Sequence, residues 1–339
     1  MTNPELSLKF KIEHMNVQTV TYQNLSFVNV SKPTDFEMKF LKNIYDFNPL
    51  ILEDYTQKTQ IPKIENYDKY TLLVFRFPVF SENVSEVSRQ SVIRFPAIYG
   101  KQPVNNRLVS SYVNLFLSED YLVVLHEGNL PKFDHIFTQC QKTLHDRTEY
   151  MGKGAIFLAY KIIDALVDDC FSVVNELRTT IDKIDKELEV KQSQKTLEEI
   201  STVRRNLVVF HTMIKPVLPL FKEMIEGKHE RLNGKMRSFW GNILEHLRKI
   251  MDRTEDNREL IEGISISNES LLTSRTNEIV KFLTVITSIA FPFVVVNNLY
   301  SMNVTLPYAK NKDIVWYLFS IIFTAGLIII FHFRRKKWL

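Results

Sequence analysis

Glycine is scarce in this chain of 339 residues, which contains only nine. Phosphate-binding loops need several glycines, and no G-x-x-x-x-G-K-[ST] pattern occurs. The nearest match, Met151-Gly152-Lys153-Gly154, lacks a preceding strand and the remaining glycine. We therefore expect no nucleotide partner. Cysteine is scarcer still, because Cys140 and Cys170 are too few for a disulfide scaffold and are typical of a reducing compartment.

The sequence also lacks the usual signatures of a catalytic site. His126-Glu127 and His229-Glu230 are not completed to H-E-x-x-H, so a zinc-peptidase site is absent, and we interpret both histidines as isolated surface residues. No G-x-S-x-G and no recognisable Cys/His pairing supports hydrolysis. We expect no enzyme activity and no catalytic cofactor.

An excess of one charge is missing as well, since 43 basic residues stand against 39 acidic ones and the net charge is only +4. This balance gives no indication of a nucleic-acid partner. Charge is absent altogether from two runs near the end of the chain, Phe282 to Val296 and Ile314 to Phe333. A hydrocarbon core is about 30 Å thick, so we predict transmembrane helices over about 279–300 and over 314–333, joined by a loop over 301–313.

The ends of the chain predict its orientation in the membrane. The opening residues, MTNPELSLKF, lack the cationic start and apolar core of a signal peptide, so insertion is expected to depend on the two spans. Four cations follow the second span in the tail 334–339: Arg334, Arg335, Lys336 and Lys337. The positive-inside bias then places the C-terminus in the cytoplasm, and two spans return the N-terminal part to the same side. We expect a multi-pass protein of the cell membrane.

The first part of the chain, 1–130, is predicted to be a cytoplasmic α/β domain. Alternation from Leu6 to Val30 and the runs 70–77, 112–116 and 121–126 indicate strands. Pro33-Thr34-Asp35 is a helix start, and apolar residues recur at helical spacing until Pro49 stops the helix. Residues 81–106 are polar with scattered prolines and are interpreted as a loop-rich insertion.

Helix signals replace strand signals after Pro131. We predict a cytoplasmic helical arm over 131–234, whose second helix runs from Leu197 to Met224. A long helix follows over 235–300 with Pro292 as its only proline, about 100 Å at 1.5 Å per residue, and continues directly into the first span. The predicted fold class is therefore α+β, followed by long helices and two C-terminal transmembrane helices.

The first span has a face that suits a water-filled path. Two helices cannot enclose such a path, so several copies would have to surround an axis, with one helix from each copy lining it. Apolar rings can gate by dewetting, and neutral oxygens can hold an ion's water shell. The alternative is that the hydroxyls only bond backbone carbonyls or join helices, but asparagines at both ends favour the pore. The predicted pore-lining residues are Asn277, Val280, Leu283, Thr284, Thr287, Phe291, Val294 and Asn298.

Two sets of charged residues flank this span, one basic and one acidic. In a ring of subunits the basic tail would gather positive charge at the cytoplasmic end of the pore, although after a single span it is usually a topology signal. Carboxylates on the long helix can bind a regulatory divalent cation between copies, and the alternative for at least half of them is a solvated helix face. These acidic residues are Glu245, Asp252, Glu255, Asp256 and Glu259.

The span ends in Tyr300-Ser301-Met302-Asn303, which resembles the Tyr-Gly-Met-Asn that ends the first span in the CorA-type magnesium and cobalt channel family. Several separated motifs in the same order extend this resemblance over nearly the whole chain. They are Pro49-Leu50, Glu53-Asp54, Gln60, Pro62-Lys63, Glu65, Tyr67, His126-Glu127, Arg204-Arg205, Asn277-Glu278, Lys281, Leu283-Thr284, Pro292 and the basic run before Trp338-Leu339.

The resemblance implies a homopentamer shaped like a funnel, with a pore lined by the first span and an outer shell of second spans. It implies a selectivity filter at Tyr300, Ser301, Met302 and above all Asn303, with Asn277 at the cytoplasmic mouth. Transport would be passive and driven by the membrane potential, with Mg²⁺ as the first candidate ion and Co²⁺ and Ni²⁺ next. Gating would follow release of Mg²⁺ from between the cytoplasmic domains.

The chain departs from the family pattern at several pore positions. Ser301 and Asn298 stand where the family has glycine, and Val280, Phe291 and Val294 replace methionine, methionine and threonine. Glycine allows backbone conformations that serine and asparagine do not. Two alternatives therefore stay open: a transporter of Zn²⁺ or another transition metal on the same fold, and a non-conducting membrane-anchored sensor of divalent ions.

Overall fold

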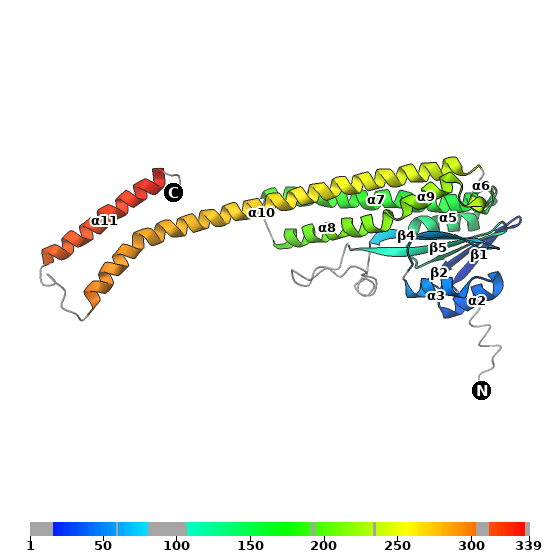
Figure 1. Ribbon diagram of the computed structural model, residues 1–339, viewed down its shortest axis with the longest axis horizontal. Helices are drawn as coiled ribbons and strands as arrows, with labels where there is room; N and C mark the ends of the chain where they lie inside the picture. Colours follow the sequence, from blue (N-terminus) through cyan, green and yellow to red (C-terminus); the bar gives the residue numbers. More distant parts are fainter. Residues whose placement is uncertain are drawn as a thin grey trace, which may run out of the picture. The chain divides into compact units, whose positions relative to one another are not determined.

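The computed structural model describes residues 16–58, 60–80, 107–190, 194–232, 235–302 and 312–335. The predicted strand near Leu6 and the predicted insertion 81–106 lie outside these ranges. The chain divides into two compact units, Met1–Glu262 and Gly263–Leu339, and each is described by itself. Figure 1 shows the order of the elements along the chain.

A six-stranded mixed sheet forms the centre of the first unit. Its order is β1 (Val17–Tyr22), β2 (Leu25–Ser31), β6 (Tyr121–His126), β5 (Leu108–Leu117), β4 (Thr71–Phe80) and β3 (Lys63–Asn66). Strands β2 and β6 pair in parallel, and the other neighbours are antiparallel. The parallel pair occupies the second and third places in this order, so neither of its strands is at an edge of the sheet.

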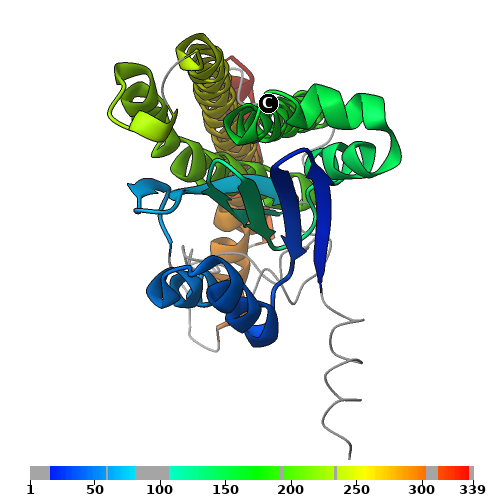
Figure 2. The same ribbon diagram turned by 90° about the vertical axis from the view of Figure 1, so that its right-hand side faces the viewer.

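Helices cover both faces of this sheet, as Figure 2 shows. One face carries α2 (Asp35–Tyr45) and α3 (Pro49–Gln57), and the connection between them stacks Phe47 on Phe116 at 4.1 Å between ring centroids. The other face carries α5 (Pro131–Lys142), α7 (Ala155–Val190), α8 (Gln194–Ile214) and α9 (Val217–Glu226), with α6 (Leu144–Met151) between α5 and α7. Burial on both sides explains why β4, β5 and β6 are nearly continuous apolar runs.

Pro49 has a different role from the one predicted. It does end the preceding helical stretch, which stops at Tyr45, but it also begins a second helix, α3, that the sequence analysis missed. Proline suits the first position of a helix because its missing N–H would have no partner there. The Asn48 side chain accepts a hydrogen bond from Leu50 N and caps this start.

The prediction of one helix from Leu197 to Met224 is wrong. Helix α8 ends at Ile214 and α9 begins at Val217, so the chain breaks at Lys215-Pro216. Proline lacks the N–H that would continue the ladder, and its ring crowds the preceding turn. The break lets α9 contact the sheet, where Phe221 stacks on Phe75 at 5.8 Å.

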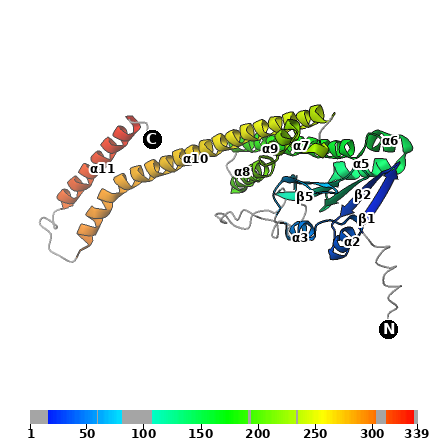
Figure 3. The same cartoon turned by 45° about the vertical axis from the view of Figure 1, so that its right-hand side comes forward.

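A single helix of 65 residues, α10 (Arg237–Ser301), follows the short 3₁₀ turn η1 (Glu230–Leu232) and includes Pro292. Within the first unit it packs along α7, and Figure 3 shows the two together above the sheet. Trp240 is fully buried there, 6.0 Å from the Tyr160 ring. Further along, the Asn257 side chain donates to Val174 O at 3.2 Å. The second unit holds the remainder of α10 and α11 (Lys312–Arg335).

Candidate pore helix and the groups around it

The C-terminal part of α10 carries a stretch that is long and apolar enough to cross a membrane, judged by length and composition within the described residues. Core helices of soluble proteins pass the same test, but they are mostly buried. Only 11% of this stretch is buried, so most of its apolar surface has no cover within one chain. An apolar helix of this length that is left uncovered needs lipid or other protein subunits around it.

One side of this segment is covered within the second unit. Val285 and Val296 are buried, and Ser288, Ile289 and Phe293 are half-buried. These positions recur every three or four residues and so lie on one face of the helix.

Helix α11 lies against this covered face. Gly326 is buried, and a Cβ added to it would lie 3.9 Å from Ile289 Cγ2. Helical neighbours of Gly326, namely Phe319, Ile322, Ile329 and Phe333, are half-buried along the same side of α11. The covered positions of the two helices therefore define a seam between them, in which Gly326 lies next to Ile289.

The opposite side of α10 carries all eight predicted pore-lining residues, and every one is exposed in the single chain. The large apolar members have high exposed fractions, 54% for Val280, 67% for Phe291 and 52% for Val294. At 100° per residue this stripe is centred roughly 150° from the seam with α11. We call it the α10 stripe: Asn277, Val280, Leu283, Thr284, Thr287, Phe291, Val294 and Asn298.

Hydroxyl groups in this segment bond to the helix itself. Thr284 Oγ1 donates to Val280 O at 2.7 Å, and Thr287 Oγ1 donates to Leu283 O at 2.9 Å. Ser301 Oγ donates to Asn297 O at 2.8 Å in the last turn of α10. Each of these hydroxyls donates its one proton to a backbone carbonyl. Its oxygen can then take part in further hydrogen bonds only as an acceptor, through its lone pairs.

The predicted filter residues lie at the end of α10. Tyr300 and Ser301 are in its last turn, and Met302 follows it with 56% of its surface exposed. Asn303 lies outside the described residues. The helical conformation reaches Ser301, so this position does not use the freedom of the glycine that the family pattern has there.

Of the basic tail, Arg334 and Arg335 end α11 and are exposed, whereas Lys336 and Lys337 lie outside the described residues.

The five acidic residues proposed for regulation are exposed on the part of α10 that belongs to the first unit. Two of them are paired, Glu245 with Lys249 at 2.6 Å and Glu255 with Arg258 at 3.6 Å. Across the described residues of one chain, no three His, Cys, Asp or Glu side chains are grouped to hold a metal ion.

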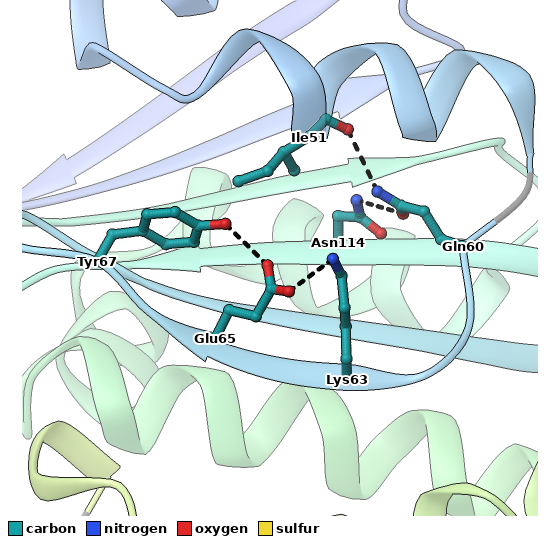
Figure 4. Close-up of polar contacts among 6 residues, drawn as sticks. All are labelled: Ile51, Gln60, Lys63, Glu65, Tyr67 and Asn114. Atoms are coloured by element: carbon teal, nitrogen blue, oxygen red, sulfur yellow. Dashed lines mark hydrogen bonds and ion pairs between the residues drawn. The ribbon is translucent and has the colours of Figure 1, made fainter.

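Residues 60–67, which resemble the family's N-terminal signature, form a network of hydrogen bonds at the sheet edge (Figure 4). We call this network the polar brace. The sequence pattern predicted no role for it. Glu65 accepts from Lys63 Nζ and from the Tyr67 hydroxyl, both at 2.8 Å. Gln60 Nε2 donates to Ile51 O at 3.2 Å, and Asn114 Nδ2 donates to Gln60 Oε1 at 2.8 Å. Gln60 thereby ties α3 to β5, and Glu65 holds Lys63 and Tyr67 together along the edge segment.

The turn after this brace is bound to the segment that leads into α10. The Arg231 guanidinium donates to Tyr67 O and Asp68 O, and Asn66 Nδ2 contacts His229 Nδ1 at 3.1 Å. The Trp240 indole N–H donates to Leu232 O at 2.9 Å. Within the first unit, the sheet edge and the start of α10 are therefore linked by direct hydrogen bonds.

The interpretation of the two histidines as surface residues is wrong. His126 is 1% exposed and His229 is 8% exposed. His126 ends a central strand, its Nε2 lies 2.8 Å from Asn29 Oδ1, and Gly128 N–H donates to its Nδ1 at 3.1 Å. Burial lowers the pKa of His126 to about 4. Both residues belong to the packed interior.

Comparison with known proteins gives a consistent result. A family model described as "CorA-like Mg2+ transporter protein" matches residues 22–336. The chain is 24% identical over 296 residues to the "Cobalt/magnesium transport protein CorA" of Thermotoga maritima, covering 87% of this chain and 78% of that protein. It is 23% identical to the protein of the same description in Methanocaldococcus jannaschii, covering 93% and 92%. The solved CorA magnesium transporter from that organism superposes with a TM-score of 0.73 at 18% identity, over 94% of each chain.

Proposed function

Since the chain belongs to the CorA-like Mg²⁺ transporter family, we propose that it is a passive divalent-cation channel of the cell membrane with Mg²⁺ as its main ion. The resemblance drawn from the sequence is thus confirmed at the level of the family, as is the α+β soluble domain with its long helix. Relatives whose names include cobalt and magnesium transport support these ions as substrates, with Co²⁺ second.

The observation that carries this proposal is the α10 stripe. It is exposed in one chain, it contains no charged side chain, and it lies opposite the seam that α11 covers. A helix with one face already packed and the other alternating polar and apolar side chains is suited to line an axis shared by several copies. We propose five copies, with α10 inside and α11 outside.

The ends of the stripe define the path of the ion in this proposal. Asn277 forms a ring at the cytoplasmic mouth, and Asn303 forms the filter ring at the other end, with Tyr300, Ser301 and Met302 shaping its approach. Amide oxygens suit Mg²⁺ because this ion sheds its water reluctantly and is better held hydrated. At 100 mV the membrane potential contributes about 4.6 kcal/mol per divalent ion, so uptake needs no other energy source.

Regulation is proposed at the acidic side of α10 in the first unit. Glu245, Asp252, Glu255, Asp256 and Glu259 fall within an arc of about 100° on the helix, and all are exposed. Mg²⁺ held between these carboxylates and a second copy would keep the cytoplasmic domains together, and its release would open the pore.

The arginines at the end of α11 keep the N- and C-termini on the cytoplasmic side.

The test is uptake into liposomes that contain the purified full-length protein and an internal indicator dye. Under a potential that is negative inside, we expect Mg²⁺ uptake by the wild type and its loss in Asn303→Ala. Asn297→Ala, on the same helix but off the stripe, is the control and should retain uptake. Uptake of Zn²⁺ but not Mg²⁺ by the wild type would support the transition-metal transporter instead. No uptake of any divalent ion by the wild type would support the non-conducting sensor.

A further inference from the structure

His229 forms one side of the contact between the sheet edge and the segment that leads into α10. It is buried, and its ring faces Asn66, the last residue of β3. Asn66 Oδ1 accepts a hydrogen bond from Thr71 Oγ1 at 3.1 Å, so Asn66 Nδ2 is the amide atom that lies 3.1 Å from His229 Nδ1. An amide nitrogen can only donate. His229 Nδ1 must therefore accept, which requires a neutral ring with its proton on Nε2.

The second ring nitrogen has a carboxylate nearby but no hydrogen bond to it. Nε2 of His229 is buried without a hydrogen-bond partner among the described residues, and Glu223 Oε2 on α9 lies 3.9 Å away. Lys228 also pairs with Glu223, at 3.6 Å, and with Glu226 at 3.1 Å. Burial lowers the pKa of His229 more than the Glu223 carboxylate raises it, so the ring is neutral at pH 7.5.

Charged groups on the other neighbouring elements have partners of their own or face solvent. On β3, Glu65 accepts from Lys63 and from the Tyr67 hydroxyl. On η1, the Arg231 guanidinium donates to two backbone carbonyls of the turn after β3, and Glu230 is exposed. The strand therefore offers the imidazole only the neutral amide of Asn66, and α9 offers it the charge of a carboxylate.

A second ring proton would turn the contact with Asn66 into a repulsive one. An N–H on Nδ1 would point at the N–H of the amide, and the amide cannot turn over without breaking the bond that Thr71 donates to its oxygen. The charged ring would be attracted to Glu223 instead. We infer that His229 is a proton-sensitive latch. When neutral it holds the sheet edge to the segment that leads into α10, and when protonated it moves toward Glu223 and releases Asn66.

Acid favours the released state of this latch. The pKa of His229 is below its ordinary value of 6.5 while the ring is latched, so between these two values the released state binds more protons. The latch is therefore fully formed at pH 7.5 and weakens as the pH falls below about 6.5. It lies within the first unit, so its behaviour does not depend on whether the protein conducts ions.

The test is hydrogen exchange of the full-length protein in detergent between pH 7.5 and 5.5, corrected for the chemical exchange rate at each pH. Leu232 N–H donates to His229 O at 2.9 Å, so a peptide that contains Leu232 reports on the latch. We expect its protection in the wild type to fall about fivefold at pH 5.5, which corresponds to the loss of one hydrogen bond. His229→Gln can still accept from Asn66 but cannot be protonated, so its protection should stay constant.

Two further variants make the result specific. His135→Gln, at an exposed histidine on α5, should behave like the wild type. Glu223→Gln removes the charge that attracts the protonated ring, so the midpoint of the loss should move to lower pH. A peptide from β5 is the internal reference, because general destabilisation by acid lowers its protection as well.

Three results would overturn the latch. They are constant protection of the wild type over this pH range, an equal loss of protection in the wild type and His229→Gln, and an unchanged midpoint in Glu223→Gln. If His229→Gln fails to fold, the midpoint of Glu223→Gln decides alone. None of these results depends on ion uptake, so the latch and the pore proposal can fail separately.

Discussion

His126 provides a sensitive test of the packing in the first unit. Gly128 N–H can only donate, so Nδ1 of the imidazole must accept, and the ring proton is then on Nε2, where it is donated to Asn29 Oδ1. A second ring proton would point at the Gly128 N–H. We therefore predict that acid unfolds the wild type partly through this residue, and that His126→Gln removes this contribution.

The magnitude follows from the lowered pKa. It is about 4 in the folded protein against 6.5 for an ordinary histidine, so between these values the unfolded chain binds more protons than the folded one. Stability must then fall as the pH falls: the contribution of His126 is fully present above pH 6.5 and is lost toward pH 4. Linkage gives a loss of about 2 kcal/mol by pH 5 and about 3 kcal/mol by pH 4.

The assay is urea unfolding of residues 1–262, which form one compact unit, at several pH values between 7.5 and 5. Other groups titrate as well, so the quantity to compare is the difference in pH dependence between the wild type and His126→Gln. His135→Gln is the matched control, because this histidine is exposed on α5. Parallel loss of stability in the wild type and His126→Gln would refute the assignment of a buried neutral imidazole.

Two further predictions concern packing. Gly326→Ala should leave thermal stability of the detergent-solubilised protein nearly unchanged, since its Cβ would meet Ile289 at an ordinary 3.9 Å, whereas Gly326→Leu should lower it by forcing α11 away from α10. Equal melting of the two variants would argue against the seam. Trp240→Phe should destabilise residues 1–262 by about 1–3 kcal/mol, because Leu232 O loses its buried donor. Trp316→Phe in the full-length protein is its control, at a residue 72% exposed, and a matching loss there would contradict this reason.

Much of the fold was predictable because local patterns suffice for it. The start at Thr34 is a capping box in the structure, since the Thr34 side chain accepts from Phe36 N and Glu37 accepts from Thr34 N. The strands that pair as β4, β5 and β6 were recognisable from their β-branched and aromatic runs. Proline caused the errors, because its effect depends on position: Pro49 starts a helix and Pro216 divides one.

The candidate site also combines features that the local sequence predicts with features that depend on the tertiary structure. The uncharged runs, the polar positions at helical spacing and the Tyr300 to Asn303 tetrapeptide are all visible in the order of residues, since membrane spans and short motifs are local features. The family follows from them. Nothing in that order says which face of α10 is covered, because this depends on where α11 lies, and Gly326 could not be paired with Ile289 beforehand.

Tertiary contacts alone decided the state of several polar residues. His126 lies 97 positions from Asn29 along the chain, and Asn66 lies 163 from His229, yet these pairs are in contact. Whether a histidine is a charged surface group or a neutral buried one depends on such distant partners, because desolvation is produced by whatever packs around it. Composition and spacing identified a membrane protein and the helix proposed to line a pore, and packing determined which side of that helix is left uncovered within one chain.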